Sequence, residues 1–128
     1  MASPTQTVTL NPSGGVPEAE ITFGDAVLGV YECKMVDPAT NQSVAVFDGD
    51  NQDDVPDKFG LKQSATAILD RNLKLIWTLT LQLATTKLCH VKITIRQDNA
   101  VAQNGEFSLA IQMDDTDPTI ALAFVRFA

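Results

Sequence analysis

The sequence predicts an all-β fold: an antiparallel β-sandwich of about eight or nine strands, jelly-roll or immunoglobulin-like, in a single domain over residues 1–128. Three observations predict it. Apolar and polar residues alternate along several short segments, turn-forming residues separate these segments, and no segment keeps a 3.6-residue periodicity over a helical length. A chain of 128 residues is also long enough to bury a core without a disulfide or a metal.

Each expected strand is a short run rich in apolar and β-branched residues, bounded by Asx, proline or glycine. In chain order the expected strands are 6–10, 19–23, 26–36, 43–47, 64–69, 72–83, 88–97, 107–113 and 119–127, with a turn over 98–105. The strands 72–83 and 88–97 alternate most strictly. Because only the link ATTK separates them, we expect a hairpin in which Trp77 lies opposite Ile93.

The same parity predicts which reactive or aromatic side chains lie in the core. Trp77 shares its face with leucines, and Tyr31 shares its face with Cys33, so both aromatic residues are expected inside. Cys33 and Cys89 lie within apolar strand patterns and are expected as free, buried thiols. The single histidine, His90, is expected to point outward without a catalytic or metal-binding role, because no carboxylate lies in its stretch.

The last strand, 119–127, is apolar on both faces. Its two sets of alternating side chains are Ile120, Leu122 and Phe124 on one side, and Ala121, Ala123, Val125 and Phe127 on the other. Two interpretations follow. The strand is either central and covered by the N-terminal segment, or it forms part of a subunit interface.

Charge is unevenly distributed along the chain. The net charge of −7 argues against nonspecific nucleic-acid binding, which requires a basic surface. The stretch from Arg71 to Arg96 nevertheless contains five basic residues and no acid. On the expected hairpin, Lys74, Lys92 and Arg96 would form a basic face beside Thr78, Thr80, Gln82 and His90. A basic face on an acidic molecule predicts a homo-oligomer held by complementary charge.

Apolar runs and the N-terminal residues bear on membrane topology and compartment. No apolar run approaches the roughly 18 residues of a membrane span, so none is expected. The N-terminal residues lack a basic region followed by an apolar one, which favours the cytoplasm, while export by another route stays open.

The segment FDGDNQDDVPDKF, residues 47–59, is the only metal-site candidate that we identify. Asp48, Asp50 and Asp54 are evenly spaced, and calcium favours several oxygen ligands from one short loop. A solvated turn explains the same residues, because Asp-Gly and Asx residues favour turns. The acidic cluster at 114–117 would complete a site if both loops lay at the same end of the fold.

An interleaved set in this segment is Asn51, Asp53 and Asp57. The nine residues GDNQDDVPD resemble the calcium-binding loops of thrombospondin type 3 repeats, whose pattern is D-x-[DN]-x-D-G-x-P-D. Matched on VPD, these three residues take ligand positions, whereas Gly49 stands in place of the first aspartate and Asp54 in place of the glycine. The resemblance implies a calcium site in this loop and no membership of that family.

We therefore expect a non-catalytic interaction module, calcium-assisted through the aspartate segment and self-associating. One histidine and two separated cysteines are too few for a catalytic triad or a zinc site, and no carboxylate pair stands out. Two alternatives stay open. One is a calcium-dependent, lectin-like carbohydrate-binding protein, and the other is a structural subunit that polymerises through edge strands.

Overall fold

Nine strands and one short helix make up the residues that this computed structural model describes, which are 5–24, 28–51, 56–82, 87–113 and 118–128. In chain order they are β1 (Thr5–Val8), β2 (Glu18–Phe23), β3 (Leu28–Asp37), β4 (Gln42–Asp50), β5 (Asp57–Gly60), α1 (Ala65–Asp70), β6 (Lys74–Gln82), β7 (Leu88–Gln97), β8 (Ala100–Gln112) and β9 (Thr119–Phe127). The predicted all-β class is confirmed, and the strand count agrees with it.

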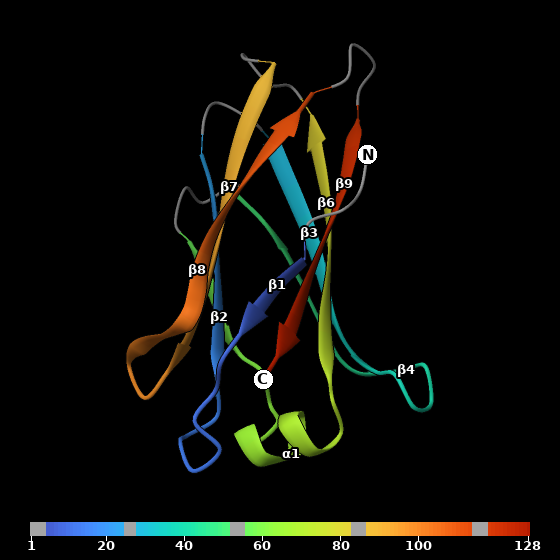
Figure 1. Cartoon of the computed structure of the whole chain (residues 1–128). Helices are drawn as coiled ribbons and strands as arrows, with labels where there is room; N and C mark the ends of the chain where they lie inside the picture. The colour runs from blue at the N-terminus through green and yellow to red at the C-terminus, as the bar shows by residue number, and fades with distance from the viewer. Residues whose placement is uncertain (1–4, 25–27, 52–55, 83–86, 114–117) are drawn as a thin grey trace.

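The strands form two sheets that lie on opposite sides of the core (Figure 1). The five-stranded sheet has the order β1-β9-β6-β3-β4, and the four-stranded sheet has the order β5-β2-β7-β8. Neighbours are antiparallel except β1 and β9, which are parallel. The prediction of a purely antiparallel fold is therefore wrong at this edge, where the first strand runs beside the last in the same direction. Backbone bonds extend this pairing, since Ala128 N donates to Val8 O at 2.9 Å.

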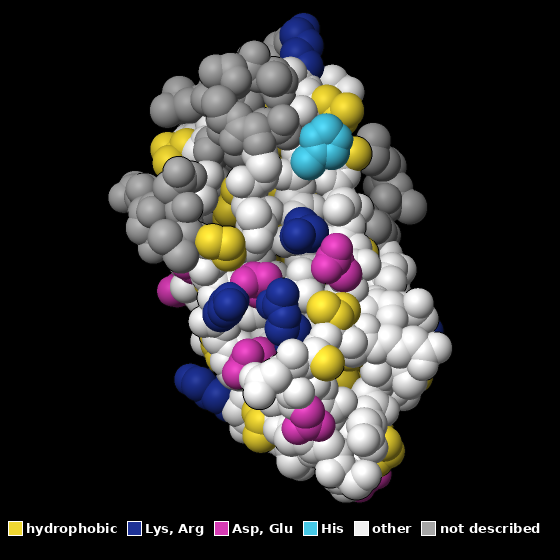
Figure 2. Space-filling model, turned by 90° about the vertical axis from the view of Figure 1, so that its left-hand side faces the viewer, with side chains coloured by type: hydrophobic (Ala, Val, Ile, Leu, Met, Phe, Trp, Pro, Cys, Tyr) yellow, Lys and Arg dark blue, Asp and Glu magenta, His cyan; other side chains and the backbone are white. Residues whose placement is uncertain are grey.

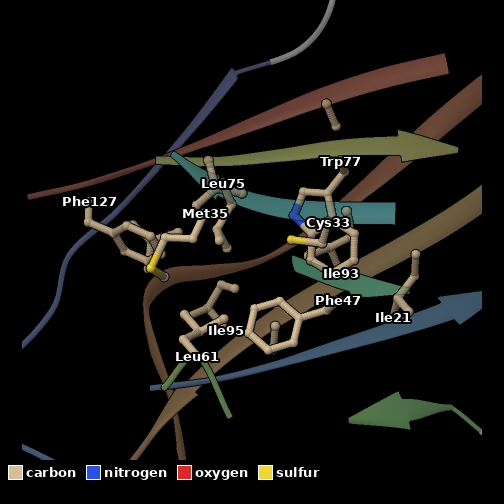
Figure 3. Packing of buried hydrophobic residues seen from close by; sticks show 14 of the residues in the cluster. Ile21, Cys33, Met35, Phe47, Leu61, Leu75, Trp77, Ile93, Ile95 and Phe127 are labelled. Atoms are coloured by element: carbon tan, nitrogen blue, oxygen red, sulfur yellow. The ribbon is translucent and has the colours of Figure 1, made fainter. Parts of the chain in front are cut away.

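The core lies between the two sheets and is built from every second residue of the strands. Trp77 and Cys33 reach it from the five-stranded sheet, and Ile93 reaches it from the four-stranded sheet (Figure 3). Trp77 is fully buried, Tyr31 is 3% exposed, and Cys33 and Cys89 are buried free thiols, as predicted. Burial stabilises by roughly 1.5–3 kcal/mol for each large apolar side chain, so this alternation supplies much of the stability.

The expected hairpin of residues 72–83 and 88–97 does not form. β6 lies between β3 and β9, whereas β7 lies in the other sheet between β2 and β8. Trp77 is opposite Cys33 of β3, and Ile93 is opposite Ile21 of β2. The predicted inward faces are nevertheless correct, because both apolar faces are buried in the shared core. Among the residues predicted to point outward, Thr94 is instead buried, at 1% exposed.

A two-residue hairpin joins β7 to β8 instead. Asp98 and Asn99 have φ of 55° and 64°, which is the left-handed pair that a type I′ turn requires. β8 begins at Ala100, so most of the turn expected over 98–105 is strand. The register of the β7–β8 pair shifts between Thr94 and Arg96, as it does at a β-bulge.

The strand expected over 64–69 is wrong, because a helix, α1, forms over Ala65–Asp70. Ser64 is the N-cap, and its side chain accepts a hydrogen bond from Ala67 N at 3.1 Å. Ala65 and Ile68, three positions apart, are the buried residues, which is helical spacing. Arg71 caps the other end and bonds Asp37 of β3 at 3.0 Å, which fixes α1 against the five-stranded sheet. In the described ranges no helix has the length and apolar character needed to cross a membrane.

Candidate functional site

The outward side of the five-stranded sheet is the strongest candidate for a functional surface. We call it the outer face, and its side chains are Val30, Glu32 and Lys34 of β3, Val46, Asp48 and Asp50 of β4, Lys74, Ile76, Thr78 and Thr80 of β6, and Ile120, Leu122, Phe124 and Arg126 of β9. Four of the seven exposed large hydrophobic residues in the described ranges lie on it. Such clustering on one face is what distinguishes a binding surface from scattered exposed side chains.

The apolar part of the outer face is centred on β9. Ile120 is 64% exposed and Leu122 is 40% exposed, and Phe124 beside them is half-buried. β1 lies next to β9 in the plane of the sheet, so Thr5–Val8 does not cover these side chains. The last strand is therefore an inner strand, between β1 and β6, as one interpretation expected, but β1 does not cover its outward side chains.

A shallow depression of about 500 Å³ lies beside this apolar area, where β4, β3 and β6 adjoin. The side chains that give it chemical character are carboxylates and hydroxyls. Its lining residues are Val30, Tyr31, Glu32, Asp48, Gly49, Asp50, Thr78 and Thr80. Carboxylates accept hydrogen bonds and attract cations, so the depression suits a cationic group or a ligand rich in hydroxyls.

Tyr31 and Asp57 lie behind this depression, on the core side of the five-stranded sheet, and connect the two sheets. The Tyr31 hydroxyl, on β3, donates to Asp57 Oδ2, on β5, at 3.0 Å. Burial, followed by the bond to Asp57, raises the pKa of Tyr31, so the phenol stays protonated at neutral pH and serves as a donor. Gly49 makes room for this pair, because a Cβ there would lie 2.9 Å from the Tyr31 oxygen and would also meet Asp57 Oδ2.

Opposite charges occupy opposite ends of the outer face. One row of side chains across the strands contains, from β4 to β9, Asp48, Glu32, Thr78 and Leu122. The next row towards the other end contains Lys34 beside Ile76 and Phe124, and Lys74 and Arg126 come one step further along their strands. Glu32 and Lys34 meet at 3.4 Å, where the acidic half changes to the basic half.

The aspartate segment is divided between strands and residues that the structure leaves undescribed. Asp48 and Asp50 point outward on β4, and Asp57 begins β5. Asn51 Oδ1 accepts from Gly29 N at 3.0 Å, so this amide fixes the end of β4 to β3. Asp53 and Asp54, like the acidic cluster 114–117, lie outside the described residues. Within the described ranges, no group of three His, Cys, Asp or Glu side chains is placed to hold a metal ion.

The predicted basic face does not exist as one surface, because β6 and β7 belong to different sheets. Lys74 lies on the outer face, whereas Lys92, Arg96 and His90 follow β7 in the four-stranded sheet. On that side of the molecule, basic and acidic side chains are intermixed (Figure 2). The best-defined group there is Glu20, which meets Arg96 at 2.8 Å and Lys58 at 3.5 Å.

This three-residue ion group is a structural feature of the four-stranded sheet. Glu20 joins β2 to both of its neighbours, because Lys58 lies on β5 and Arg96 lies on β7. The bond and charge of Arg96 lower the pKa of the Glu20 carboxyl in spite of its burial. An ionised, paired carboxylate of this kind stabilises the sheet and is poorly suited to proton transfer near neutral pH.

Sequence reasoning singled out several residues of the outer face but did not place them on one surface. Among them were Lys74, Thr78 and Thr80 of the expected basic face and Asp48 and Asp50 of the aspartate segment. The apolar faces of strand 119–127 indicated Ile120 and Leu122. Glu32, Val30 and Val46 were missed, because single exposed residues in an alternating strand carry no signal of their own. Only the pairing of β3 with β4 and β6 places them beside the last strand.

Comparisons of the chain with protein-family models, with curated proteins and with solved structures found no match.

Proposed function

We propose that this chain is a non-catalytic interaction module that binds protein through the outer face and self-associates there. The observation that carries the proposal is the clustering of Val30, Val46, Ile120 and Leu122, each at least 40% exposed, on one face. Exposed large apolar side chains on one sheet face, bordered by charges, are typical of protein-binding surfaces. The same clustering supports the subunit-interface interpretation of the last strand.

The titration behaviour of the described groups supports a non-catalytic role. Glu20 and Asp37 have lowered pKa values because arginines and backbone amides stabilise their ionised forms. Tyr31 has a raised pKa because of burial. A general acid or base works best with a pKa near the operating pH, and each of these shifts moves away from neutrality.

Within the all-β class, we propose a sandwich that is closer to a jelly roll than to an immunoglobulin fold. The support is nested pairing, in which β3 pairs with β6 and β2 pairs with β7. Two nested strand pairs of this kind, one in each sheet, are expected when a long hairpin rolls up, as it does in a jelly roll. The parallel β1–β9 edge is an addition to that plan.

A calcium-assisted form of this function is a second candidate. Asp57 is favourably held, because ligating carboxylates are commonly oriented by a hydrogen bond such as the one from Tyr31. Ligands would come from Asn51, Asp53 and Asp57, with Asp48, Asp50 and Asp54 nearby. A lectin-like role would use the carboxylates and hydroxyls of the depression, since Tyr31 and Trp77 are buried.

Calcium binding is tested by thermal unfolding with calcium and with EDTA. A ligand that binds only the folded state raises the unfolding midpoint, by about 2.7 kcal/mol of stability at a hundredfold excess over Kd. Coincident curves would remove both the calcium-assisted form and the calcium-dependent lectin. Loss of the shift in Asp53→Asn, with Asp98→Asn as a control distant in sequence, would place the ion in the aspartate segment.

Self-association is tested by sedimentation equilibrium from micromolar to millimolar protein. The net charge of −7 repels two copies at long range, so the buffer should contain about 0.15 M salt, where screening acts beyond roughly 8 Å. An average mass that rises with concentration is expected. A constant monomer mass over the whole range would contradict the proposal.

A further inference from the structure

We infer that two copies of this chain pack outer face against outer face, about a two-fold axis that lies in the interface and crosses the strands at right angles. This inference rests on the proposed function, because it assigns a partner and a geometry to the same face. In such a dimer each strand lies over its own copy, running in the opposite direction. Every row of side chains is then covered by a different row.

The charges of the outer face carry the choice of this axis. The row with Asp48 and Glu32 lies next to the row with Lys34 along the strands. An axis between these two rows places the first row of one copy over the second row of the other copy. Glu32 of one copy then faces Lys34 of the other, and by symmetry the contact occurs twice. With the Glu32–Lys34 pair already present in each chain at 3.4 Å, the interface contains a ring of four alternating charges.

The apolar residues of β9 are brought together by the same rotation. Leu122 belongs to the Glu32 row and Phe124 belongs to the Lys34 row, so Leu122 of one copy covers Phe124 of the other. Ile76 likewise faces Thr78 across the interface. Leu122 is thus buried against an apolar side chain, and Ile120, one row further out, lies over the aliphatic stem of Arg126 of the other copy.

The size of the face suits a dimer that forms at high concentration. The outer face has four strands about 4.8 Å apart and about seven residues at about 3.3 Å per residue, which gives roughly 19 by 23 Å, or about 440 Å². Stable specific interfaces bury about 800 Å² per partner, and transient ones bury less. The described part of the outer face therefore supports a concentration-dependent dimer and not a permanent one.

An axis that runs along the strands is disfavoured by the same charges. That rotation keeps each row at its own level and exchanges the strands, so Glu32 of one copy never lies over Lys34 of the other. An axis near β3 and β4 sets acids over acids, and an axis along β6 sets Glu32 over Leu122. Like charges brought together across an interface oppose association. The acidic and basic ends can complement each other only if one copy is reversed along the strand direction.

The test uses charge-reversal variants that fail alone and recover when mixed. In Glu32→Lys the dimer would place lysine over Lys34, and in Lys34→Glu it would place glutamate over Glu32. Because each reversal acts twice in a symmetric interface, we expect each variant to dimerise about tenfold more weakly or worse by sedimentation equilibrium. An equimolar mixture should form a heterodimer with Kd within about threefold of wild type, since both contacts are again opposite in charge.

Matched controls come from the four-stranded sheet. Glu106→Lys and Lys92→Glu reverse exposed charges on that side and should leave the dimer unchanged, alone and mixed. Leu122→Asp should abolish dimerisation, whereas Val101→Asp, at a position 45% exposed on β8, should not. Circular dichroism checks that each variant is folded.

The outcomes separate the inference from the proposed function. Weak single variants with recovery on mixing support the reversed two-fold dimer. A wild-type dimer that tolerates the single variants, or variants that do not recover on mixing, overturns this geometry and leaves self-association intact. A monomeric wild type overturns both.

Discussion

Replacing Gly49 with alanine is the most direct test of how β3, β4 and β5 are held together. A Cβ at Gly49 would lie 2.9 Å from both Cε1 and the hydroxyl oxygen of Tyr31, and it would also meet Asp57 Oδ2. Real Cβ atoms do not approach other atoms so closely, so the Tyr31 ring or the Asp57 carboxylate must move. We expect the 3.0 Å hydrogen bond between them to break.

The expected magnitude follows from three contributions. Losing a hydrogen bond to a charged partner costs about 1.5–3 kcal/mol, and forcing a methyl group into a packed site costs about 1–3 kcal/mol. Alanine in a strand is favoured over glycine by roughly 0.5–1 kcal/mol, which offsets part of that loss. The free energy of unfolding of Gly49→Ala should therefore fall by about 1.5–5.5 kcal/mol, with a central value of about 3 kcal/mol.

Urea unfolding followed by fluorescence of the single Trp77 measures this change. With a slope of about 1–3 kcal/mol per molar urea, the midpoint should fall by roughly 1–2 M. Gly60→Ala in β5 is the matched control, because no described residue lies within 4 Å of its Cβ position, and it should be neutral or slightly stabilising. In a Tyr31→Phe background, Gly49→Ala should cost less, since the bond is already absent. If Gly49→Ala unfolds at the wild-type midpoint or above it, the close approach is not real and the reasoning fails.

Three further predictions test other parts of the fold. Ser64→Ala should lower the free energy of unfolding by about 1 kcal/mol in urea titrations, because it removes the acceptor for Ala67 N, whereas Ser64→Asn should retain most of the stability. Trp77→Ala should lower the free energy of unfolding by about 3–5 kcal/mol. Trp77→Phe should lower it by less than half as much, because phenylalanine also removes an indole N–H that is buried without an acceptor among the described residues. Equal losses in the two variants would show that this donor is satisfied. Arg96 lowers the pKa of Glu20 below its ordinary value of 4.5, so this pair stabilises the fold above that pH and stops doing so as pH falls through the lowered pKa. Arg96→Gln should therefore lower the urea midpoint at pH 7 and have a much smaller effect once the pH is low enough to protonate Glu20. An equal effect at both pH values would indicate that packing, and not charge, is lost.

The fold class and the buried faces could be predicted from the sequence because they depend on local alternation. Trp77, Tyr31 and Cys33 were assigned to the core from parity alone, and they are buried. Residues 64–69 were misassigned as a strand, because a six-residue helix is too short to show helical periodicity. Its N-cap Ser64 was the available signal, although a lone serine before an apolar run is also common in loops.

The outer face could be predicted only in part because it depends on which strands become neighbours. Ile120 and Leu122 are visible in the sequence as an apolar face that a monomer rarely leaves open. Their juxtaposition with Glu32 requires β6 between β9 and β3, a pairing between residues more than forty positions apart. No local pattern encodes such a partner, since alternation tells which way a side chain points and not what lies beside it.

The hairpin expected between residues 72–83 and 88–97 did not form, and a comparison with the hairpin that does form, between β7 and β8, shows why. β6 and β7 have complementary apolar faces, and those faces are buried equally well whether the strands are neighbours in one sheet or face each other across the core. Burial of these faces therefore does not decide between the two arrangements, and the link does not specify a tight hairpin either. ATTK contains no glycine, asparagine, aspartate or proline, whereas Asp98-Asn99 supplies two residues that tolerate positive φ, and the tight hairpin forms there. Inserting Asn-Gly in place of the link should consequently not join β6 to β7 unless their partners β3, β9, β2 and β8 are also lost, because the long-range pairs, and not the connection, determine which sheet each strand enters.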